Sequence, residues 1–114
     1  MELSTKKEGD IIIIYLEGRL EVNVTLEIET QVNTVMENNP DSHILFDLRS
    51  VEHMSSSGIR LFVATSRILK ASKRRLVICG MNSAVKKIFS IVELMDMFAI
   101  YEDEDKALAS FKRS

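Results

Sequence analysis

The sequence is poor in the residues that cross-link or interrupt a small domain. It contains one cysteine, one proline, four glycines and no tryptophan. A single thiol cannot form an internal disulfide, so a disulfide-stabilised secreted scaffold gains no support. The cysteine, Cys79, lies within an apolar run, where the expected role is that of a small buried hydrophobe.

Charge of one sign and long apolar runs are also missing. The 15 Lys and Arg residues nearly balance the 17 Asp and Glu residues, whereas nucleic-acid binders usually carry a strongly basic domain. The one basic cluster (Lys70, Lys73, Arg74, Arg75) falls at the end of a predicted helix, where cations complement the helix dipole. No run approaches the roughly 20 apolar residues that span a membrane. We therefore expect a cytoplasmic protein that neither binds nucleic acid nor inserts into a membrane.

Motifs for catalysis, metals and cofactors are absent as well. The two histidines, His43 and His53, do not have metal-ligand spacing, and no glycine-rich nucleotide fingerprint is present. A serine nucleophile at Ser56 would need a base and an orienting acid, and the Gly-x-Ser-x-Gly elbow is missing. The sequence therefore predicts no catalytic residue, no metal site and no cofactor.

The sequence does contain regularly alternating strand and helix patterns. With 46% hydrophobic and 28% charged residues, the chain has the composition of one globular domain over residues 1–114. The run Ile11 to Leu16 predicts a strand buried on both faces, paired with the N-terminal segment across the turn Glu8-Gly9-Asp10. Further strands are predicted at residues 43–48, 75–79 and 98–101.

Helical periodicity appears between these strands. Ile28, Val32, Val35 and Met36 define an amphipathic helix over residues 24–37, which Asn23 or Thr25 could cap. After a loop over residues 49–57, a second helix is predicted over residues 58–73. A third, capped by Ser83, carries Ala84, Val85, Ile88, Phe89 and Val92, and a fourth covers residues 103–112.

The order of elements indicates the fold class. Two strands followed by alternating helices and strands predict an α/β domain with one mixed sheet. An antiparallel hairpin opens the sheet, parallel crossover strands complete it, and about four helices cover it.

A run of serines marks the most informative segment, Met54-Ser55-Ser56-Ser57-Gly58, which lies where the second predicted helix begins. Helix N-termini have unpaired N–H groups and the positive end of the dipole, so serine hydroxyls can cap them and phosphate is favoured there. Simple capping is one interpretation. The other is a phosphorylation switch, because added phosphate brings roughly −1.5 to −2 charges to a surface that is otherwise neutral.

The segment from Phe46 to Ile59 resembles the signature of STAS domains, in particular of bacterial anti-sigma-factor antagonists. That signature is an apolar-Asp-Leu-x-x-Val strand and loop followed by Met/Ile-Asp-Ser-Ser/Thr-Gly-Leu/Ile. Three other segments resemble family motifs in the same order, so the resemblance covers almost the whole chain. They are residues 16–21, 76–80 and 82–89.

The resemblance implies a function in partner switching. The unphosphorylated antagonist would bind an anti-sigma factor that is also a serine kinase, and phosphorylation would separate them until a serine phosphatase resets the system. The implied phosphoacceptor is Ser56, with Ser55 and Ser57 as alternatives. Two positions depart from the family: Ser55 and Glu21 stand where it usually or often has Asp.

We expect the partner-binding surface to combine the serine segment with a second loop, at Arg19 to Asn23, because both loops follow strands that would be neighbours. Its expected residues are Arg19, Glu21, Asn23, Ser55, Ser56, Ser57, Gly58, Ile59 and Arg60. Phe62 and Val63 would extend it, although Ile59 and Phe62 could instead be core. The alternative function is a STAS interaction module of another assembly, of the stressosome, lipid-transport or transporter type, without a phosphorylation switch. Oligomeric state is left open.

Overall fold

The computed structural model describes residues 3–91 and 95–113, which form one mixed sheet with helices on both faces. Within this part of the chain the sheet has five strands in the order β1-β2-β3-β4-β5. The first pair is antiparallel and the other pairs are parallel. The strands are β1 (Ser4–Glu8), β2 (Ile11–Leu20), β3 (His43–Met54), β4 (Leu76–Cys79) and β5 (Ala99–Tyr101).

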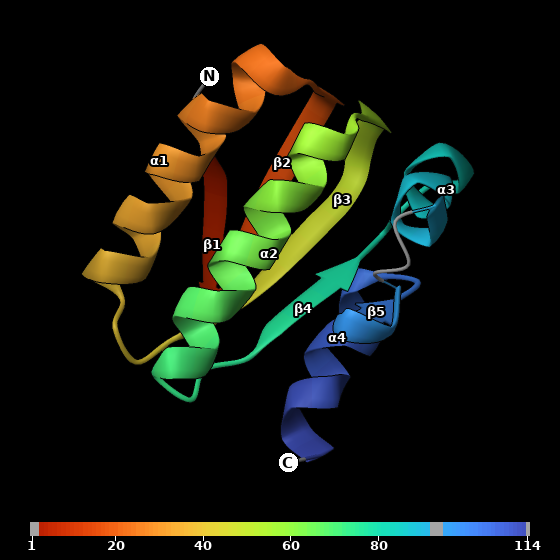
Figure 1. The fold of residues 1–114 in the computed structure, drawn as a ribbon. Coiled ribbons are helices and arrows are strands. Elements are labelled where there is room, and N and C mark those ends of the chain that lie inside the picture. Colours follow the sequence, from red (N-terminus) through yellow and green to blue (C-terminus); the bar gives the residue numbers. More distant parts are fainter. Residues whose placement is uncertain (1–2, 92–94, 114) are drawn as a thin grey trace.

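The helices follow the predicted alternation. They are α1 (Val22–Asn38), α2 (Ser56–Ala71), α3 (Ser83–Ile91) and α4 (Glu104–Ser110), with 3-10 turns at Met95–Met97 and Phe111–Arg113. Figure 1 shows α1 and α2 side by side across one face of the sheet, with α3 beyond the end of β4. The predicted α/β fold with an N-terminal hairpin is confirmed.

Strand β2 explains why its apolar run has no polar alternation. Ile12 and Ile14 pack into the core beneath α1 and α2, whereas Ile11 and Ile13 pack against the opposite cluster, which includes Ala107 of α4. Both faces of the strand are covered, as a parallel sheet requires.

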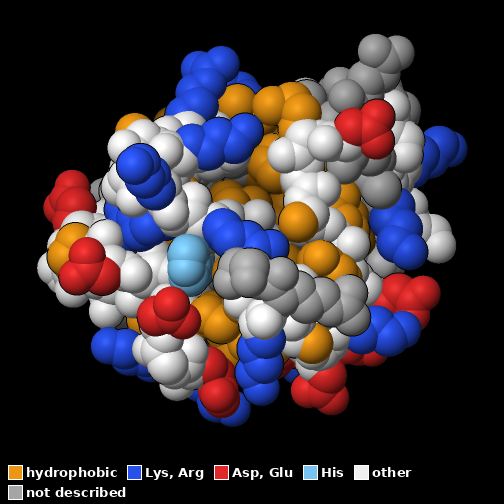
Figure 2. All heavy atoms as spheres, turned by 90° about the horizontal axis from the view of Figure 1, so that it is seen from below, with side chains coloured by type: hydrophobic (Ala, Val, Ile, Leu, Met, Phe, Trp, Pro, Cys, Tyr) orange, Lys and Arg blue, Asp and Glu red, His pale blue; other side chains and the backbone are white. Residues whose placement is uncertain are grey.

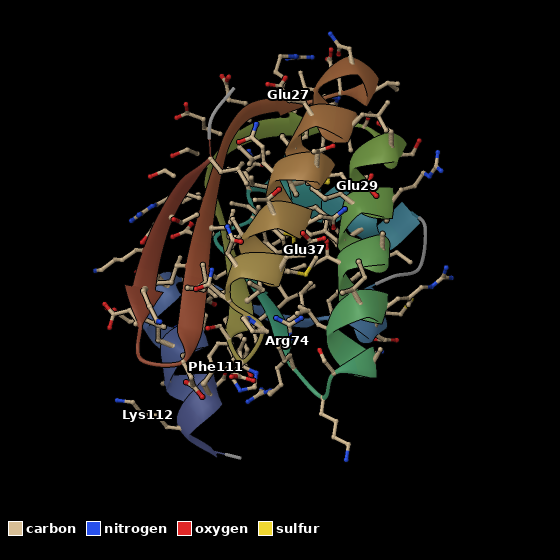
Figure 3. All side chains as sticks on the ribbon, turned by 90° about the vertical axis from the view of Figure 1, so that its left-hand side faces the viewer. Glu27, Glu29, Glu37, Arg74, Phe111 and Lys112 are labelled. Atoms are coloured by element: carbon tan, nitrogen blue, oxygen red, sulfur yellow. The ribbon has the colours of Figure 1, made fainter. Side chains whose placement is uncertain are left out.

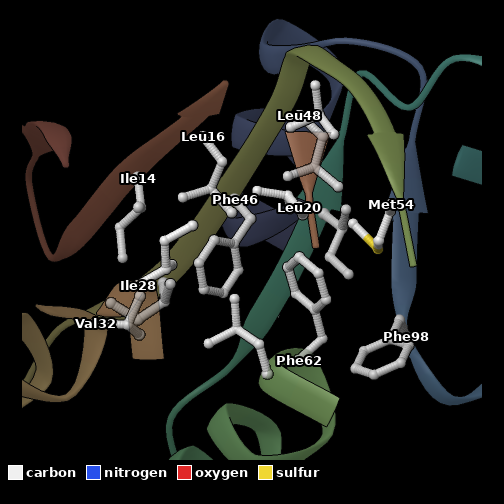
Figure 4. Close-up of a cluster of buried hydrophobic side chains, with 14 of the residues drawn as sticks. Ile14, Leu16, Leu20, Ile28, Val32, Phe46, Leu48, Met54, Phe62 and Phe98 are labelled. Carbon is white, nitrogen blue, oxygen red and sulfur yellow. The ribbon is translucent and has the colours of Figure 1, made fainter. Parts of the chain in front are cut away.

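The larger core lies between the sheet and the pair α1 and α2 (Figure 4). Phe62 of α2 packs edge-on against Phe46 of β3, with 5.0 Å between ring centroids and 84° between ring planes. Edge-to-face contact is a favourable aromatic geometry, so these two rings join α2 firmly to the centre of the sheet.

Strands β2 and β3 are longer than the sequence indicated, and the predicted loop at residues 49–57 is largely wrong. β3 continues to Met54, and its extension pairs with Glu17 to Leu20 through register shifts. Of the extension, residues 49–54, only Val51 and Met54 are buried. Because the extension is mostly polar and paired through bulges, its sequence lacks the regular alternation that predicts a strand. Helix α2 begins at Ser56, two residues before the predicted start.

Two predicted helix caps are wrong. Helix α1 begins after Glu21, whose side chain makes no capping bond, and the Thr25 hydroxyl instead donates to the Glu21 carbonyl at 2.7 Å. Helix α3 is capped by Asn82 rather than Ser83, because Asn82 Oδ1 accepts the Val85 N–H at 2.9 Å. Val92, also expected on this helix, lies outside the described residues.

Two residues of the basic cluster at the end of α2, Arg74 and Arg75, contact other parts of the chain. The Arg74 guanidinium donates to the carbonyls of Met36, Asn39 and Ser42 at 3.4, 3.0 and 3.4 Å, beneath the end of α1 (Figure 3). The Arg75 guanidinium lies 4.9 Å from the centre of the Phe111 ring. The face seen from below carries intermingled basic and acidic side chains (Figure 2). Two of the four basic residues, Arg74 and Arg75, therefore make contacts that stabilise the fold.

Candidate functional site

The candidate site lies where β2 and β3 end and where α1 and α2 begin. The Ser55 N–H donates to the Leu20 carbonyl at 3.0 Å, which joins the two strand ends directly. The prediction that the serine segment and the loop at Arg19 to Asn23 are neighbours is confirmed. Parallel pairing causes this arrangement, because the carboxyl ends of neighbouring parallel strands meet at one edge.

Ser55 and Ser57 are held by each other and by the end of β2. The Ser55 hydroxyl donates to the Leu20 carbonyl at 3.2 Å and lies 2.6 Å from the Ser57 hydroxyl. Ser55 is the N-cap of α2, but its side chain makes no capping bond. An Asp carboxylate could accept from Ser57 but could not donate to Leu20. The simple-capping interpretation is wrong, because the Ser55 hydroxyl bonds to Leu20 and Ser57 and not to an N–H group of α2.

Ser56 differs from both neighbours. It is the first residue of α2, its side chain is exposed, and its hydroxyl makes no hydrogen bond to any residue that the structure describes. The positive end of the α2 dipole lies at this point. The hydroxyl is consequently accessible to a reacting partner in a way that the other two are not.

The residues after Ser57 divide between surface and core. Arg60 is exposed, as expected, whereas Gly58 is buried so closely that an added Cβ would lie 2.5 Å from Met54 Cγ. Ile59 is 4% exposed and Phe62 is fully buried. Gly58 and Phe62 therefore shape the surface from beneath and offer no contact area, which corrects their inclusion in it.

The segment Arg19 to Asn23, which was expected to be a loop, is instead the end of β2 and the start of α1 with Glu21 alone between them, and it contributes charged groups beside the serine segment. Arg19 and Glu21 form an exposed ion pair, with 3.1 Å between Arg19 Nε and Glu21 Oε1, and Asn23 is exposed on the first turn of α1. The charge at Glu21 is thus already paired with Arg19 at the end of β2. An exposed pair of this kind contributes little stability, so its groups can exchange partners at low cost.

A second polar cluster lies where Asp47, in the middle of β3, pairs with Cys79 at the end of β4. Asp47, which is 3% exposed, accepts the Arg49 N–H at 2.9 Å, and its carboxyl lies in the same small cavity as that of Glu104. Burial, and then the neighbouring Asp47 carboxyl, raise the pKa of Glu104. The Tyr15 hydroxyl donates to both Glu104 oxygens, at 3.2 and 3.0 Å, and burial with this bond raises the pKa of Tyr15 to about 12.

Sequence reasoning missed this cluster because its members come from three separate elements. Glu104 carried no signal beyond an acidic first turn of a helix. The cluster lies with α4, on the other side of the sheet from α1 and α2.

The histidines and the cysteine show no arrangement that points to catalysis. His43 Nδ1 accepts the Arg75 N–H at 2.9 Å, and burial raises the pKa of the Cys79 thiol to about 12. Residues 3–91 and 95–113 contain no group of three metal-ligating side chains and no helix long and apolar enough to cross a membrane.

The chain is similar to known proteins over nearly its whole length. The family model for the STAS domain matches residues 2–107. An anti-sigma-B factor antagonist of Staphylococcus aureus is 28% identical over 102 residues, covering 90% of this chain and 94% of that protein. An anti-sigma factor antagonist from Mycobacterium paratuberculosis has a TM-score of 0.86 at 18% identity, covering 96% and 92% of the two chains.

The antagonist SpoIIAA has been solved in two states. The unphosphorylated form has a TM-score of 0.82 at 20% identity, covering 96% of each chain. The phosphorylated form, from Bacillus, has a TM-score of 0.72 at 19% identity, covering 96% and 98%. At these identities the solved structures show a common fold.

Proposed function

This chain belongs to the STAS domain family, and on that premise we propose that it is an anti-sigma factor antagonist switched by phosphorylation of Ser56. It binds an anti-sigma factor that is also a serine kinase, in the cytoplasm, and releases a sigma factor by doing so. The observation that carries the proposal is the exposed, unbonded hydroxyl of Ser56 beside two serines whose hydroxyls are engaged.

The reaction would be performed by the partner, with this chain as its substrate. The Ser56 oxygen attacks the γ-phosphorus of ATP held by the kinase, the bond to the bridging oxygen breaks and ADP leaves. The hydroxyl proton passes to a base on the kinase. A serine phosphatase reverses the modification by hydrolysis.

The position of Ser56 makes the switch local. Phosphate adds roughly −1.5 to −2 charges at the start of α2, where the helix dipole favours an anion. The fold is consequently preserved, while an interface that fits a neutral hydroxyl loses affinity through repulsion and desolvation.

Binding and modification can be tested with a cognate anti-sigma factor kinase. With ATP, mass spectrometry should show one phosphate added to the wild type and to Ser55→Ala and Ser57→Ala. Ser56→Ala should accept none. Phosphate on Ser55 or Ser57 in the wild type would contradict the assignment of Ser56.

The phosphate's effect on binding can be imitated with Ser56→Asp. Calorimetry should show weaker kinase binding, by about tenfold or more, because the carboxylate carries part of the phosphate charge. Circular dichroism should show an unchanged fold. Firm binding without any phosphate transfer would favour the alternative, a STAS module that serves another assembly.

A further inference from the structure

A groove runs between α1 and α2 and begins at Ser56. Its volume is about 420 Å³. Ile59, Val63 and Ala64 supply an apolar floor, and the other lining residues are Ser56, Arg60, Arg67 and, from α1, Glu29. Figure 3 shows Glu29 on α1 near α2. These lining residues define the α1–α2 groove.

Exposed apolar side chains lie next to the Ser56 end of the groove. Val22 is 64% exposed and Leu26 is 69% exposed. They share one face of α1 with Glu29, because residues three, four and seven positions apart in a helix are neighbours. Both helices begin at the same edge of the sheet, so Val22 and Leu26 flank the start of the groove. Clustered exposed hydrophobics of this kind mark contact surfaces.

The charges along the groove are divided between the helices. Over Ser56–Ala71, α2 carries Arg60, Arg67 and Lys70 and has no acidic residue. Arg60 and Arg67 make no ion pair or hydrogen bond with any described residue. Helix α1 has no basic residue over Val22–Asn38. The α2 side of the groove therefore presents two unpaired guanidinium groups, which are suited to carboxylates.

We propose that the α1–α2 groove docks an amphipathic helix of the anti-sigma factor. The apolar face of that helix covers Leu26 and the floor of the groove, and acidic side chains along one edge pair with Arg60 and Arg67. This inference rests on the proposed function, because it names the part of the same partner that binds beside Ser56.

The groove also couples docking to phosphorylation. Ser56 and Arg60 are four residues apart on α2, so a phosphate on Ser56 lies within reach of the Arg60 guanidinium. The phosphate then withdraws Arg60 from the partner and repels the acidic edge of the docked helix. One modification thereby weakens both the charged contact and the approach of the partner.

The charge part of the proposal is tested by calorimetry of the full chain with a cognate anti-sigma factor kinase. Arg67→Glu should weaken binding by about tenfold or more, and the loss should shrink at higher salt. Lys70→Glu makes the same charge change on the same helix outside the groove, and should stay within about threefold of the wild type.

The apolar part of the proposal is tested with a second pair of matched variants. Leu26→Ser should weaken binding by about tenfold. Ile68→Ser alters another exposed apolar residue, on α2 outside the groove, and should stay within about threefold. Circular dichroism confirms that each variant is folded.

The outcomes separate the two proposals. If the wild type binds, and Arg67→Glu and Leu26→Ser bind equally well, the groove is not the docking site and the proposed function stands. If the wild type does not bind at all, the proposed function itself fails. Hydrogen exchange on the partner should show a protected helix with acidic residues, and protection of a segment without them would overturn the identity of the occupant.

Discussion

The carboxyls of Asp47 and Glu104 lie in the same small polar cavity, and the presence of Asp47 contributes to the raised pKa of Glu104. Glu104 faces Asp47 on β3, Tyr15 on β2 and, at longer range, Lys6 on β1. Arg49 lies 3.6 Å from Asp47 Oδ2, and Asp103 and Glu102 lie beside Glu104 in the same small cavity. Burial and the neighbouring Asp47 carboxyl both disfavour the charged form of Glu104, which is why the pKa of Glu104 is raised.

This pair should make the fold less stable as pH rises. The pKa of Glu104 is higher in the folded chain than its ordinary value of 4.5, so protonation favours folding. The stabilisation is complete below 4.5 and is lost as pH rises through the folded value. Urea unfolding at a series of pH values should show this decline, and Glu104→Gln should flatten it because an amide can accept from Tyr15 and does not titrate.

The neighbouring Glu102 provides a control of opposite sign. Its hydrogen bond to Lys106 lowers the pKa of this fully exposed carboxyl, so its small contribution is lost as pH falls. Glu102→Gln should leave the decline at rising pH intact. An equally steep decline in Glu104→Gln would show that another group is responsible.

At the scale of elements, the start of α2 is packed through a glycine. Alanine is ordinarily favoured over glycine inside a helix by about 1 kcal/mol. At Gly58, however, a Cβ would lie 2.5 Å from Met54 Cγ and 3.2 Å from its sulfur, inside a fully buried contact. The close approach of α2 to the end of β3 therefore depends on the absence of a side chain at this position.

Gly58→Ala should lower the free energy of unfolding by roughly 1–2 kcal/mol, since overpacking outweighs helix propensity. Thermal melts and urea titration measure the loss. In a double-mutant cycle with Met54→Ala, the two losses should sum to more than the double variant shows, because the smaller side chain makes room. Additive losses would mean that Met54 does not cause the strain.

At the scale of the whole molecule, one sheet supports two apolar layers. Adjacent residues of β3 point to opposite sides: Phe46 belongs to the layer beneath α1 and α2, and Leu45 to the layer with α4. A change in either layer therefore acts on the same strand, and we expect the domain to unfold as one unit.

Cavity variants in the two layers test this expectation. Leu45→Ala should cost about 2–5 kcal/mol and Phe46→Ala about 3–5 kcal/mol. Tyr15 and Tyr101 both pack against the Leu45 layer, so tyrosine fluorescence reports that side, while circular dichroism follows the helices. The two signals should change together in both variants. Separate transitions in Leu45→Ala would show that the α4 layer unfolds independently.

Local patterns in the chain were sufficient for the fold. Periodicity and apolar runs identified the hairpin, the parallel strands and the four helices, because each signal lies within one element. They did not reveal the extension of β3 to Met54, whose pairing with the end of β2 depends on two distant segments meeting. The caps at Glu21 and Asn82 were missed for a similar reason, since both depend on where the neighbouring strand ends.

The serine segment shows most clearly the difference between signals that lie within one segment and contacts that depend on distant segments. The sequence by itself determined that three serines stand near a helix start in a chain resembling STAS domains, and the resemblance implied Ser56 as the phosphoacceptor, with Ser55 and Ser57 as alternatives. Only the tertiary structure showed which hydroxyls are hydrogen-bonded, because the Leu20 carbonyl from another strand engages Ser55, and Ser55 in turn engages Ser57. A hydroxyl's freedom depends on its neighbours in space, and those neighbours are set by the pairing of β2 with β3.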